Sequence, residues 1–385
     1  MSTHYRICLI TGSYPPLRCG VGDYASQLAR ALAAGGNKIH VITSHNVEQG
    51  SGEVTVRAVV RRWTIKGMPG LLRAIRNIHP DLVHLQYPTN GYGYRLGPQA
   101  LVMLCRFTGV KIITTSHEFI RARFLRRLSL IPLFLFSHGL IFTSEEERTS
   151  VGTAMPWLRN KLNRASTIIP VGTNIPVDAS PGRHPGSGKT VSFFGLFFPG
   201  RMIELVIDVF GEISRRMPEV RFLLIGDIHP LHKDYYRKIR DYASQELPDS
   251  RLEWFMGRSS EEISHALASS SVCLLPYPDG ATFRRTTLIA ALALGIPVVT
   301  TRSDLTPEQL REGQPVLFGS GQKQLAEQVM QVLADPGLAM QLSGNARRIA
   351  AGFSWDRIVK DHLGAYARVV SPGGAPDAVS MKGPQ

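Results

Sequence analysis

The chain has 385 residues, of which 43% are hydrophobic and 19% charged, with 44 Lys and Arg against 30 Asp and Glu. This composition excludes a disordered or fibrous protein, and the length suffices for two domains that each bury a core. The formal net charge of +14 favours anionic partners such as nucleotides, phospholipid headgroups or nucleic acid, without choosing among them.

We expect no segment of this sequence to span a membrane or to act as a secretory signal. Its longest apolar run, 128–136, is interrupted by Ser129 and Pro132 and is far shorter than the ~20 residues that span a bilayer. The N-terminus lacks the basic start of a secretory signal. The four cysteines show neither Cys-x-x-Cys nor metal-like spacing, so we expect no disulfide, no zinc and a cytoplasmic protein.

The first half of the chain alternates short apolar runs with helical patterns. Near-continuous apolar runs are typical of parallel strands that are buried on both faces. Leu28, Ala31 and Leu32 recur at helical spacing within the predicted helix 22–34, which Gly35-Gly36 ends. The predicted strands are Arg6–Thr11, Lys38–Thr43, Asp81–Gln86, Lys111–Ser116, Gly139–Thr143 and Thr167–Val171.

The alternation stops at 177–189, which is rich in Pro and Gly and predicts a linker. It then resumes through strands at Thr190–Gly195, Val220–Gly226, Arg251–Met256, Ser271–Pro276, Pro297–Thr301 and Pro315–Phe318, with helices at Ile203–Arg216, Glu261–Ser269, Thr287–Leu294 and Gln322–Ala334. We therefore predict two doubly wound, Rossmann-like α/β domains at 1–176 and 190–354, a final helix at 355–370 and a disordered tail at 371–385.

Ligands of such sheets bind beyond the carboxyl ends of the strands, so the loops there are the candidate site. The first loop, 13–23, opens a helix, and its glycines Gly20 and Gly22 would let the backbone approach a phosphate. A tight turn without a ligand is the alternative. His117 and Glu118 follow the fourth strand, where an imidazole could hydrogen-bond a sugar hydroxyl or a reacting group.

Two loops of the second half carry further candidates. Gly195 and Arg201 belong to a Gly-Pro loop that opens a helix, and a guanidinium there would match diphosphate oxygens. The segment 275–299 then places a polar cluster at a helix start, where anions are favoured. This cluster consists of Asp279, Arg284, Arg285, Thr286 and Thr287.

Taken in order, these segments resemble the family 4 glycosyltransferases (glycosyl transferases group 1), which have the GT-B fold. The likeness covers roughly residues 6–369. Its motifs are Pro15-Pro16 with Gly20-Val-Gly22, Asp81-Leu-Val-His84, Ser144-Glu-Glu146, Ile169-Pro-Val-Gly172, Ile225-Gly-Asp227, Gly257-Arg-Ser-Ser-Glu-Glu262, Ala293-Leu-Gly-Ile-Pro-Val-Val299 and Phe353-Ser-Trp-Asp356.

The resemblance implies a nucleotide-diphosphate sugar held mainly by the C-terminal domain across a cleft, with the final helix crossing back to the N-terminal domain. It implies transfer with retention of anomeric configuration and without a metal or other cofactor. Gly20 and Gly22 then map near the donor phosphate, His117 near the transferred sugar, and Arg201 onto the diphosphate. The acceptor, a glycan or lipid-linked glycan, would lie on the N-terminal side, where we also place Asp23 and Glu118.

The sequence also departs from this family. Two glutamates that usually precede the Gly-x-Pro-Val segment fall on Thr282 and Ala290, and one usual basic residue falls on Leu196. We hypothesise that Arg284 or Arg285 supplies the missing positive charge, with Thr286 and Thr287 as hydrogen-bonding groups. A non-catalytic homologue that binds a nucleotide-sugar or glycan and a nucleotide-sugar epimerase remain alternatives.

A basic and apolar stretch, 119–136, sets Arg121, Arg123, Arg126 and Arg127 beside a run of large apolar residues. It predicts either a patch that binds an anionic membrane on its inner face or a buried helix whose basic start is solvated. Two other functions are disfavoured. A nicotinamide-dependent oxidoreductase is disfavoured because the first loop lacks the dinucleotide-binding glycine spacing. Nucleic-acid binding is disfavoured because it would rest on net charge alone.

Overall fold

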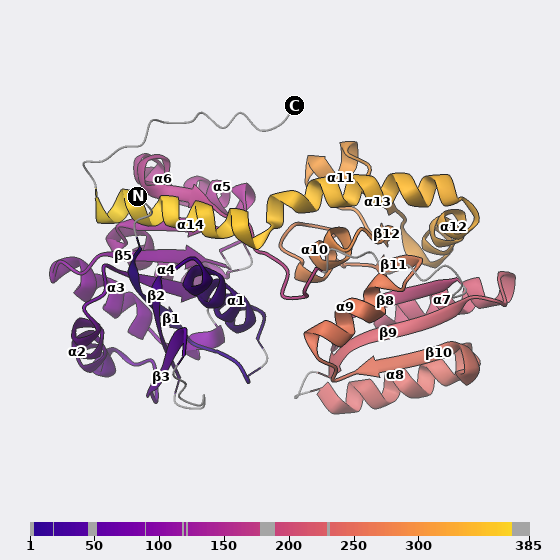
Figure 1. The fold of residues 1–385 in the computed structure, drawn as a ribbon, viewed down its shortest axis with the longest axis horizontal. Helices are drawn as coiled ribbons and strands as arrows, with labels where there is room; N and C mark the ends of the chain where they lie inside the picture. Colours follow the sequence, from indigo (N-terminus) through magenta and orange to yellow (C-terminus); the bar gives the residue numbers. More distant parts are fainter. Residues whose placement is uncertain are drawn as a thin grey trace. The chain divides into compact units, whose positions relative to one another are not determined.

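The structure, a computed structural model, describes residues 4–17, 19–44, 52–88, 90–117, 119–120, 122–177, 189–228 and 232–371. The chain divides into two compact units. The first unit comprises Met1–Val171 and Trp355–Gln385, and the second comprises Gly172–Ser354. Each is built on a parallel sheet with helices (Figure 1), which confirms the predicted pair of Rossmann-like α/β domains.

The first unit holds a seven-stranded sheet in the order β3-β2-β1-β4-β5-β6-β7, with every pairing parallel. The central strands are buried on both faces, as their apolar runs predicted. Its strands are β1 (Arg6–Thr11), β2 (Lys38–Ser44), β3 (Val54–Val60), β4 (Leu82–Tyr87), β5 (Ile112–Ser116), β6 (Gly139–Phe142) and β7 (Ser166–Ile168).

Helices cover both faces of this sheet. The side chains that alternate toward one face, such as Val83 and Leu85, share a core with α2, α3, α4 and α5. On the other side α14, the last helix, packs against α1 and β5. These helices are α1 (Gly20–Ala34), α2 (Met68–Ile78), α3 (Gly97–Phe107), α4 (Phe124–Phe136), α5 (Glu145–Ala154), α6 (Arg159–Ala165) and α14 (Trp355–Val370).

The second unit holds a six-stranded parallel sheet in the order β10-β9-β8-β11-β12-β13. Its strands are β8 (Thr190–Phe197), β9 (Arg221–Ile228), β10 (Leu252–Met256), β11 (Val272–Leu275), β12 (Val298–Thr300) and β13 (Val316–Phe318). Its helices are α7 (Ile203–Arg216), α8 (Lys233–Glu246), α9 (Ser260–Ala268), α10 (Thr286–Ala293), α11 (Glu308–Glu312), α12 (Gly321–Ala334) and α13 (Pro336–Ala350).

Two segments that carried the family resemblance are helix starts. The Ser144 side chain accepts a hydrogen bond from the Glu147 backbone N–H at the first turn of α5. Ser259 and Glu262 form a reciprocal capping box at the start of α9. Each arrangement satisfies N–H groups that a helix leaves without an internal partner, so these motifs define where α5 and α9 begin.

The structure differs from the predicted elements at several points. The sequence analysis missed β3, an edge strand with half-buried positions and a charged Arg57 that interrupt its apolar pattern. It ended β8 at Gly195, two residues early. The second unit begins at Gly172, whereas the first domain was predicted to extend to residue 176. The reason is that Ile175 is buried in the core of the second unit and that Ser264 Oγ donates a hydrogen bond to the Pro176 carbonyl at 2.6 Å.

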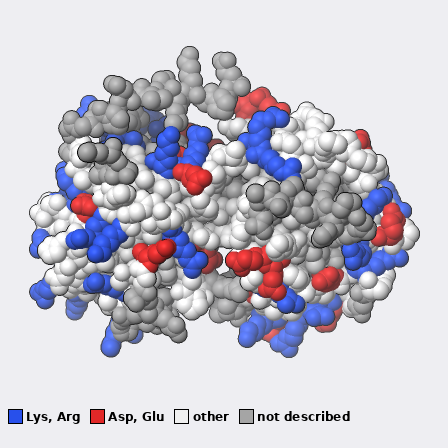
Figure 2. Space-filling view, in the orientation of Figure 1, with Lys and Arg blue, Asp and Glu red and all other residues white. Residues whose placement is uncertain are grey.

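Most of the predicted linker and nearly all of the predicted tail, 178–188 and 372–385, lie outside the described residues. Across the described part of the chain, no helix combines the length and apolar character that a membrane crossing requires. On the face drawn in Figure 2, Lys and Arg lie scattered over both units with Asp and Glu among them, and do not gather in a single field.

Candidate functional site

The loop between β1 and α1 makes close backbone contacts at its glycines. A Cβ atom at Gly12 would lie 2.0 Å from the carbonyl oxygen of Gly91, and one at Gly22 would lie 2.9 Å from that of Ser13. Gly22 therefore lets the first turn of α1 lie against the loop. A Cβ atom at Gly20 would meet nothing within 4 Å, so Gly20 has open space at the start of α1.

Asp23 lies in the first turn of α1, where it is half-buried. A carboxylate at this position is stabilised by the helix dipole and balances part of its positive potential. A structural role for Asp23 is therefore present before any acceptor is considered. Its predicted place on the acceptor side stays a prediction.

His117 follows β5 at the carboxyl edge of the first sheet and is held from two sides. Its Nε2 atom lies 2.8 Å from Oε1 of Gln86 on β4. The Tyr24 ring of α1 packs against it at nearly a right angle, with 5.8 Å between ring centroids. Trp355, the first residue of α14, packs behind Tyr24 at 5.5 Å. Glu118, which was predicted on the acceptor side, and Arg121, which belongs to the predicted membrane patch, lie outside the described residues.

In the second unit, Gly195 lies inside β8 and is buried, two residues before the strand ends. Its carbonyl oxygen faces Gly226 on the neighbouring strand β9. Arg201 lies beyond the end of β8, just before α7, and its guanidinium stacks over the Phe198 ring at 4.9 Å. The structure thus places Gly195 in the sheet and Arg201 in the loop at its carboxyl edge.

The cluster after β11 is organised around Tyr277, which the sequence analysis did not single out. The Arg285 guanidinium stacks over the Tyr277 ring at 4.8 Å and forms an ion pair with Asp279. The Tyr277 hydroxyl lies 2.9 Å from Thr287 Oγ1. Burial raises the pKa of Tyr277, and the Thr287 hydrogen bond and the Arg285 and Arg201 charges oppose that rise. Arg285 therefore contacts this tyrosine directly at the edge of the sheet.

The contacts of Arg285 within this cluster limit what its side chain can offer to a ligand. The charge of Arg285 is balanced by Asp279, and its side chain is only 15% exposed. Arg284 and Thr286 are half-buried beside it, and Thr286 opens α10. The ion pair with Asp279 reduces the positive potential that Arg285 can offer to a second anion.

The two positions that usually carry glutamates have other roles here. Thr282 lies in the loop before α10, where its carbonyl accepts from the Arg285 backbone N–H at 3.1 Å. Ala290 is fully buried in α10. A carboxylate at position 290 would be desolvated in this packing, so the alanine fits the helix interior as the chain builds it.

Sequence signals for the overlooked residues do exist. His84 and Gln86 alternate with apolar residues on β4, and Tyr277 stands between two prolines directly after β11. Polar side chains at every second position of an otherwise apolar buried strand mark one face of a sheet as polar. This alternation could have identified Gln86, whereas the contact between Tyr277 and Arg285 depends on loop conformation.

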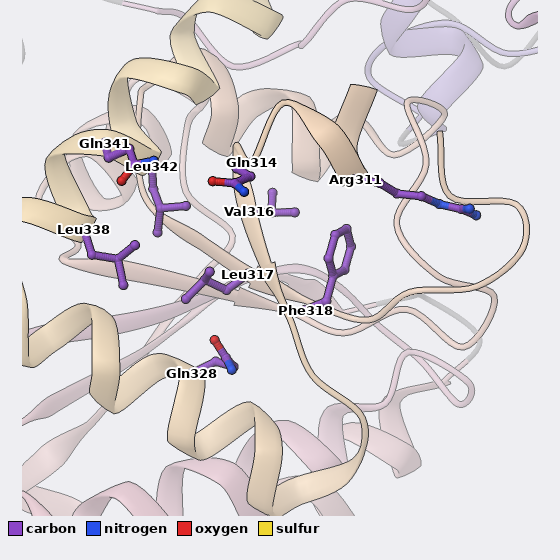
Figure 3. Close-up of a pocket in the computed structure, with 9 residues that line it drawn as sticks. All are labelled: Arg311, Gln314, Val316, Leu317, Phe318, Gln328, Leu338, Gln341 and Leu342. Atoms are coloured by element: carbon purple, nitrogen blue, oxygen red, sulfur yellow. The ribbon is translucent and has the colours of Figure 1, made fainter. Parts of the chain in front are cut away.

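A pocket of about 360 Å³ lies elsewhere in the second unit, at the edge strand β13 and between α12 and α13. Leu317 and Phe318 of β13 and Leu338 and Leu342 of α13 line it, and Arg311 extends away from the other lining side chains (Figure 3). None of the predicted donor-binding residues lines it. Among the described residues, no group of His, Cys, Asp and Glu side chains is placed to hold a metal ion.

Two family descriptions match successive parts of the chain. Residues 19–171 match "Glycosyltransferase Family 4" and residues 176–349 match "Glycosyl transferases group 1". The chain is a family 4 glycosyltransferase. The predicted family and enzyme class are thereby confirmed.

Relatives of this glycosyltransferase extend over nearly its whole length. It is 21% identical to phosphatidyl-myo-inositol mannosyltransferase of Mycobacterium leprae over 92% of this chain and 94% of that protein. Its fold is shared with sucrose-phosphate synthase of Thermosynechococcus elongatus, at a TM-score of 0.69 and 19% identity over 95% and 99% of the two chains. Anabaena HepE in complex with UDP and glucose aligns at a TM-score of 0.69 and 16% identity over 94% and 100%.

Proposed function

We propose that this glycosyltransferase moves a sugar from a nucleotide-diphosphate sugar to a glycan or lipid-linked glycan, with retention of anomeric configuration and without a metal. The observation that carries the proposal is the cluster at the carboxyl edge of the second sheet, where Arg285 stacks on Tyr277 beside the first turn of α10 and Arg201 lies in the loop after the neighbouring strand β8. Guanidinium groups and helix N–H donors together provide the positive potential that a diphosphate leaving group needs.

Two relatives support the substrate classes. HepE has been solved with UDP and with UDP-glucose, which supports a nucleotide-sugar donor. The M. leprae relative is named for phosphatidyl-myo-inositol, a lipid, which supports a lipid-linked acceptor. Retention is what the family resemblance implies. The anomeric proton of the product, observed by NMR, would reveal inversion if this part of the proposal were wrong.

The donor site is tested by calorimetric titration with UDP, GDP, ADP, TDP and their common sugar conjugates. We expect saturable binding of one nucleotide, and Arg201→Ala should raise its Kd about 10- to 100-fold, since hydrogen bonds to charged groups contribute about 1.5–3 kcal/mol. If Arg284 or Arg285 supplies the missing positive charge, its replacement by alanine should also raise the Kd, and an unchanged Kd in both Arg284→Ala and Arg285→Ala would overturn that hypothesis.

Arg221→Ala is the matched control, since this exposed arginine begins β9 at the opposite edge of the same sheet. Its Kd should equal that of the wild type. Absence of binding by every nucleotide would overturn the donor assignment and favour the non-catalytic alternative. An unchanged Kd in Arg201→Ala would remove Arg201 from the site.

We also propose that the enzyme binds an anionic membrane through the start of α4. Phe124 and Leu125 are 73% and 78% exposed there, beside Arg123 and Arg126. The rest of the helix packs into the core through Leu130, Leu133 and Phe134. The first turn therefore fits the membrane interpretation and the later turns fit the buried-helix interpretation.

Arg126 and Arg127, the two arginines near the start of α4, make different contacts. The Arg126 guanidinium stacks over the exposed Tyr94 ring at 4.6 Å. Arg127 donates to the carbonyls of Ala122 and Ile120 at 3.0 and 3.1 Å, so it holds the turn in place. Exposed apolar side chains flanked by cations are the combination that inserts at an anionic lipid surface.

Co-sedimentation with phosphatidylglycerol-containing vesicles at low salt tests this membrane site. We expect wild-type binding that weakens with salt, and at least about tenfold weaker binding by Phe124→Ser with Leu125→Ser, since each exposed side chain loses about 1.5–3 kcal/mol of burial. Met340→Ser, at an equally exposed position of the second unit, should bind like the wild type. Wild-type protein that stays in the supernatant would remove the membrane proposal.

A further inference from the structure

A row of polar side chains runs across one face of the otherwise apolar first sheet. His84 and Gln86 lie on β4, and Thr115 lies on β5 opposite Gln86 in the parallel register. All three are at most 1% exposed. Burying such groups costs free energy unless each is hydrogen-bonded, so each side chain of this row is expected to have a hydrogen-bond partner.

The bonds form a continuous chain that ends at His117. Tyr366 of α14 places its hydroxyl 2.8 Å from His84 Nδ1. His84 Nε2 lies 3.0 Å from Gln86 Nε2 and 2.7 Å from Thr115 Oγ1. Gln86 Oε1 then lies 2.8 Å from Nε2 of His117. The chain therefore links the last helix to the residue predicted to contact the transferred sugar.

The order of donors and acceptors in this chain follows from the orientation of the Gln86 amide, whose nitrogen faces His84 and whose oxygen faces His117. Its nitrogen can only donate, so His84 Nε2 accepts and His84 Nδ1 carries the hydrogen that is donated to Tyr366. Its oxygen can only accept, so His117 donates from Nε2. A neutral His117 then has an unprotonated Nδ1 as its remaining ring nitrogen.

Burial keeps the internal histidines neutral, as this order requires. Desolvation lowers the pKa of His84 well below its ordinary value, and nearby His362 and His117 lower it further. His362, whose ring centroid lies 5.5 Å from that of His84, has its pKa lowered by burial to about 4. Near neutral pH, His84 therefore has one N–H and one acceptor, and the chain runs in one direction.

We propose that Gln86 and His84 are positioning residues that hold the His117 ring in the Nε2–H form at the carboxyl edge of the first sheet. The catalytic consequence rests on the proposed function, whereas the protonation of His117 does not. Tyr24 packs edge-on against the His117 ring and itself packs against Trp355, so these aromatic contacts restrict the ring further. A reacting group held this way needs little reorganisation when substrate binds.

Nitrogen-15 NMR of the full-length protein with labelled histidine tests the proposal directly. The His117 resonances are assigned by their loss in His117→Gln. At pH 8 we expect wild-type His117 to be protonated at Nε2 and unprotonated at Nδ1. Gln86→Leu should shift His117 toward a mixture of both tautomers, and Gln86→Glu, which keeps an acceptor oxygen, should restore protonation at Nε2.

Gln99→Leu is the matched control, because Gln99 is an equally buried glutamine of the same unit whose amide donates to Tyr87 at 3.0 Å. It should leave the His117 spectrum unchanged. A wild-type His117 with its proton on Nδ1 would overturn the proposal without any variant. An unchanged spectrum in Gln86→Leu would overturn it as well.

Turnover separates this proposal from the proposed function. With the donor identified by calorimetry, Gln86→Leu should lower kcat about 10- to 100-fold while leaving nucleotide Kd unchanged, because loss of orientation affects the reacting geometry. An unchanged kcat would remove the positioning role even if the tautomer shifts. If no nucleotide binds, the donor assignment fails while the NMR result still decides the state of His117.

Discussion

Replacing His117 with alanine is expected to lower kcat by about 100-fold or more. The ring lies at the carboxyl edge of the first sheet, held by Gln86 at 2.8 Å and by Tyr24. A positioned imidazole that exchanges a hydrogen bond or a proton with a reacting group contributes roughly 10²–10⁴-fold. The measurement is the initial rate at saturating donor.

The nucleotide Kd of His117→Ala should stay unchanged, because the arginines proposed to contact the diphosphate belong to the second unit. His265→Ala, at an exposed histidine in the last turn of α9, controls for the loss of a histidine as such. A variant that retains wild-type kcat would show that His117 has a structural role only. A variant with raised nucleotide Kd would show that it contacts the nucleotide itself.

Replacing Gly226 with alanine is expected to destabilise the second unit by at least about 3 kcal/mol. The new Cβ atom would lie 1.8 Å from the carbonyl oxygen of Gly195, the residue paired with it on β8. Because the obstacle is backbone in the middle of the sheet, no side-chain rotation relieves the clash. Moving either strand would break hydrogen bonds between β8 and β9.

Hydrogen exchange with mass spectrometry is the suitable measurement, since it follows each unit separately where a two-unit chain need not unfold in one step. Peptides from β8 and β9 should lose protection in Gly226→Ala, while those of the first unit keep it. Gly344→Ala is the control, because its Cβ atom would meet nothing within 4 Å on α13. That variant should be stabilised by about 0.5–1 kcal/mol.

The strand and helix pattern predicted most of the fold, because buried parallel strands have a composition that few other elements share. Edge strand β3 escaped this signal, since an edge position tolerates the charged Arg57. The pattern also did not predict that the two units divide near Val171, because this boundary depends on which of the two cores buries Ile175. Local composition therefore predicts elements better than it predicts their tertiary partners.

The candidate site shows the same limit. Its loops could be predicted because parallel sheets gather functional residues at one edge. Arg201, His117 and residues 279–285 lie in such loops, and Thr286 and Thr287 open the helix that follows. The pairing of Arg285 with Asp279 depends on loop conformation, which sequence spacing does not determine. The contact of His84 with Tyr366 joins residues 282 positions apart, and no local pattern connects them.

That separation affects how the protein is made. The face of the first sheet that carries His84 and Gln86 is completed by α14, which is synthesised after the whole second unit. At ~5–20 residues per second, the ribosome needs roughly 15–55 s to travel from His84 to Tyr366. During that time His84 lacks its α14 partner, while the second unit, continuous from 172 to 354, can already close around its own core. The unit whose synthesis begins first is therefore the unit that is finished last.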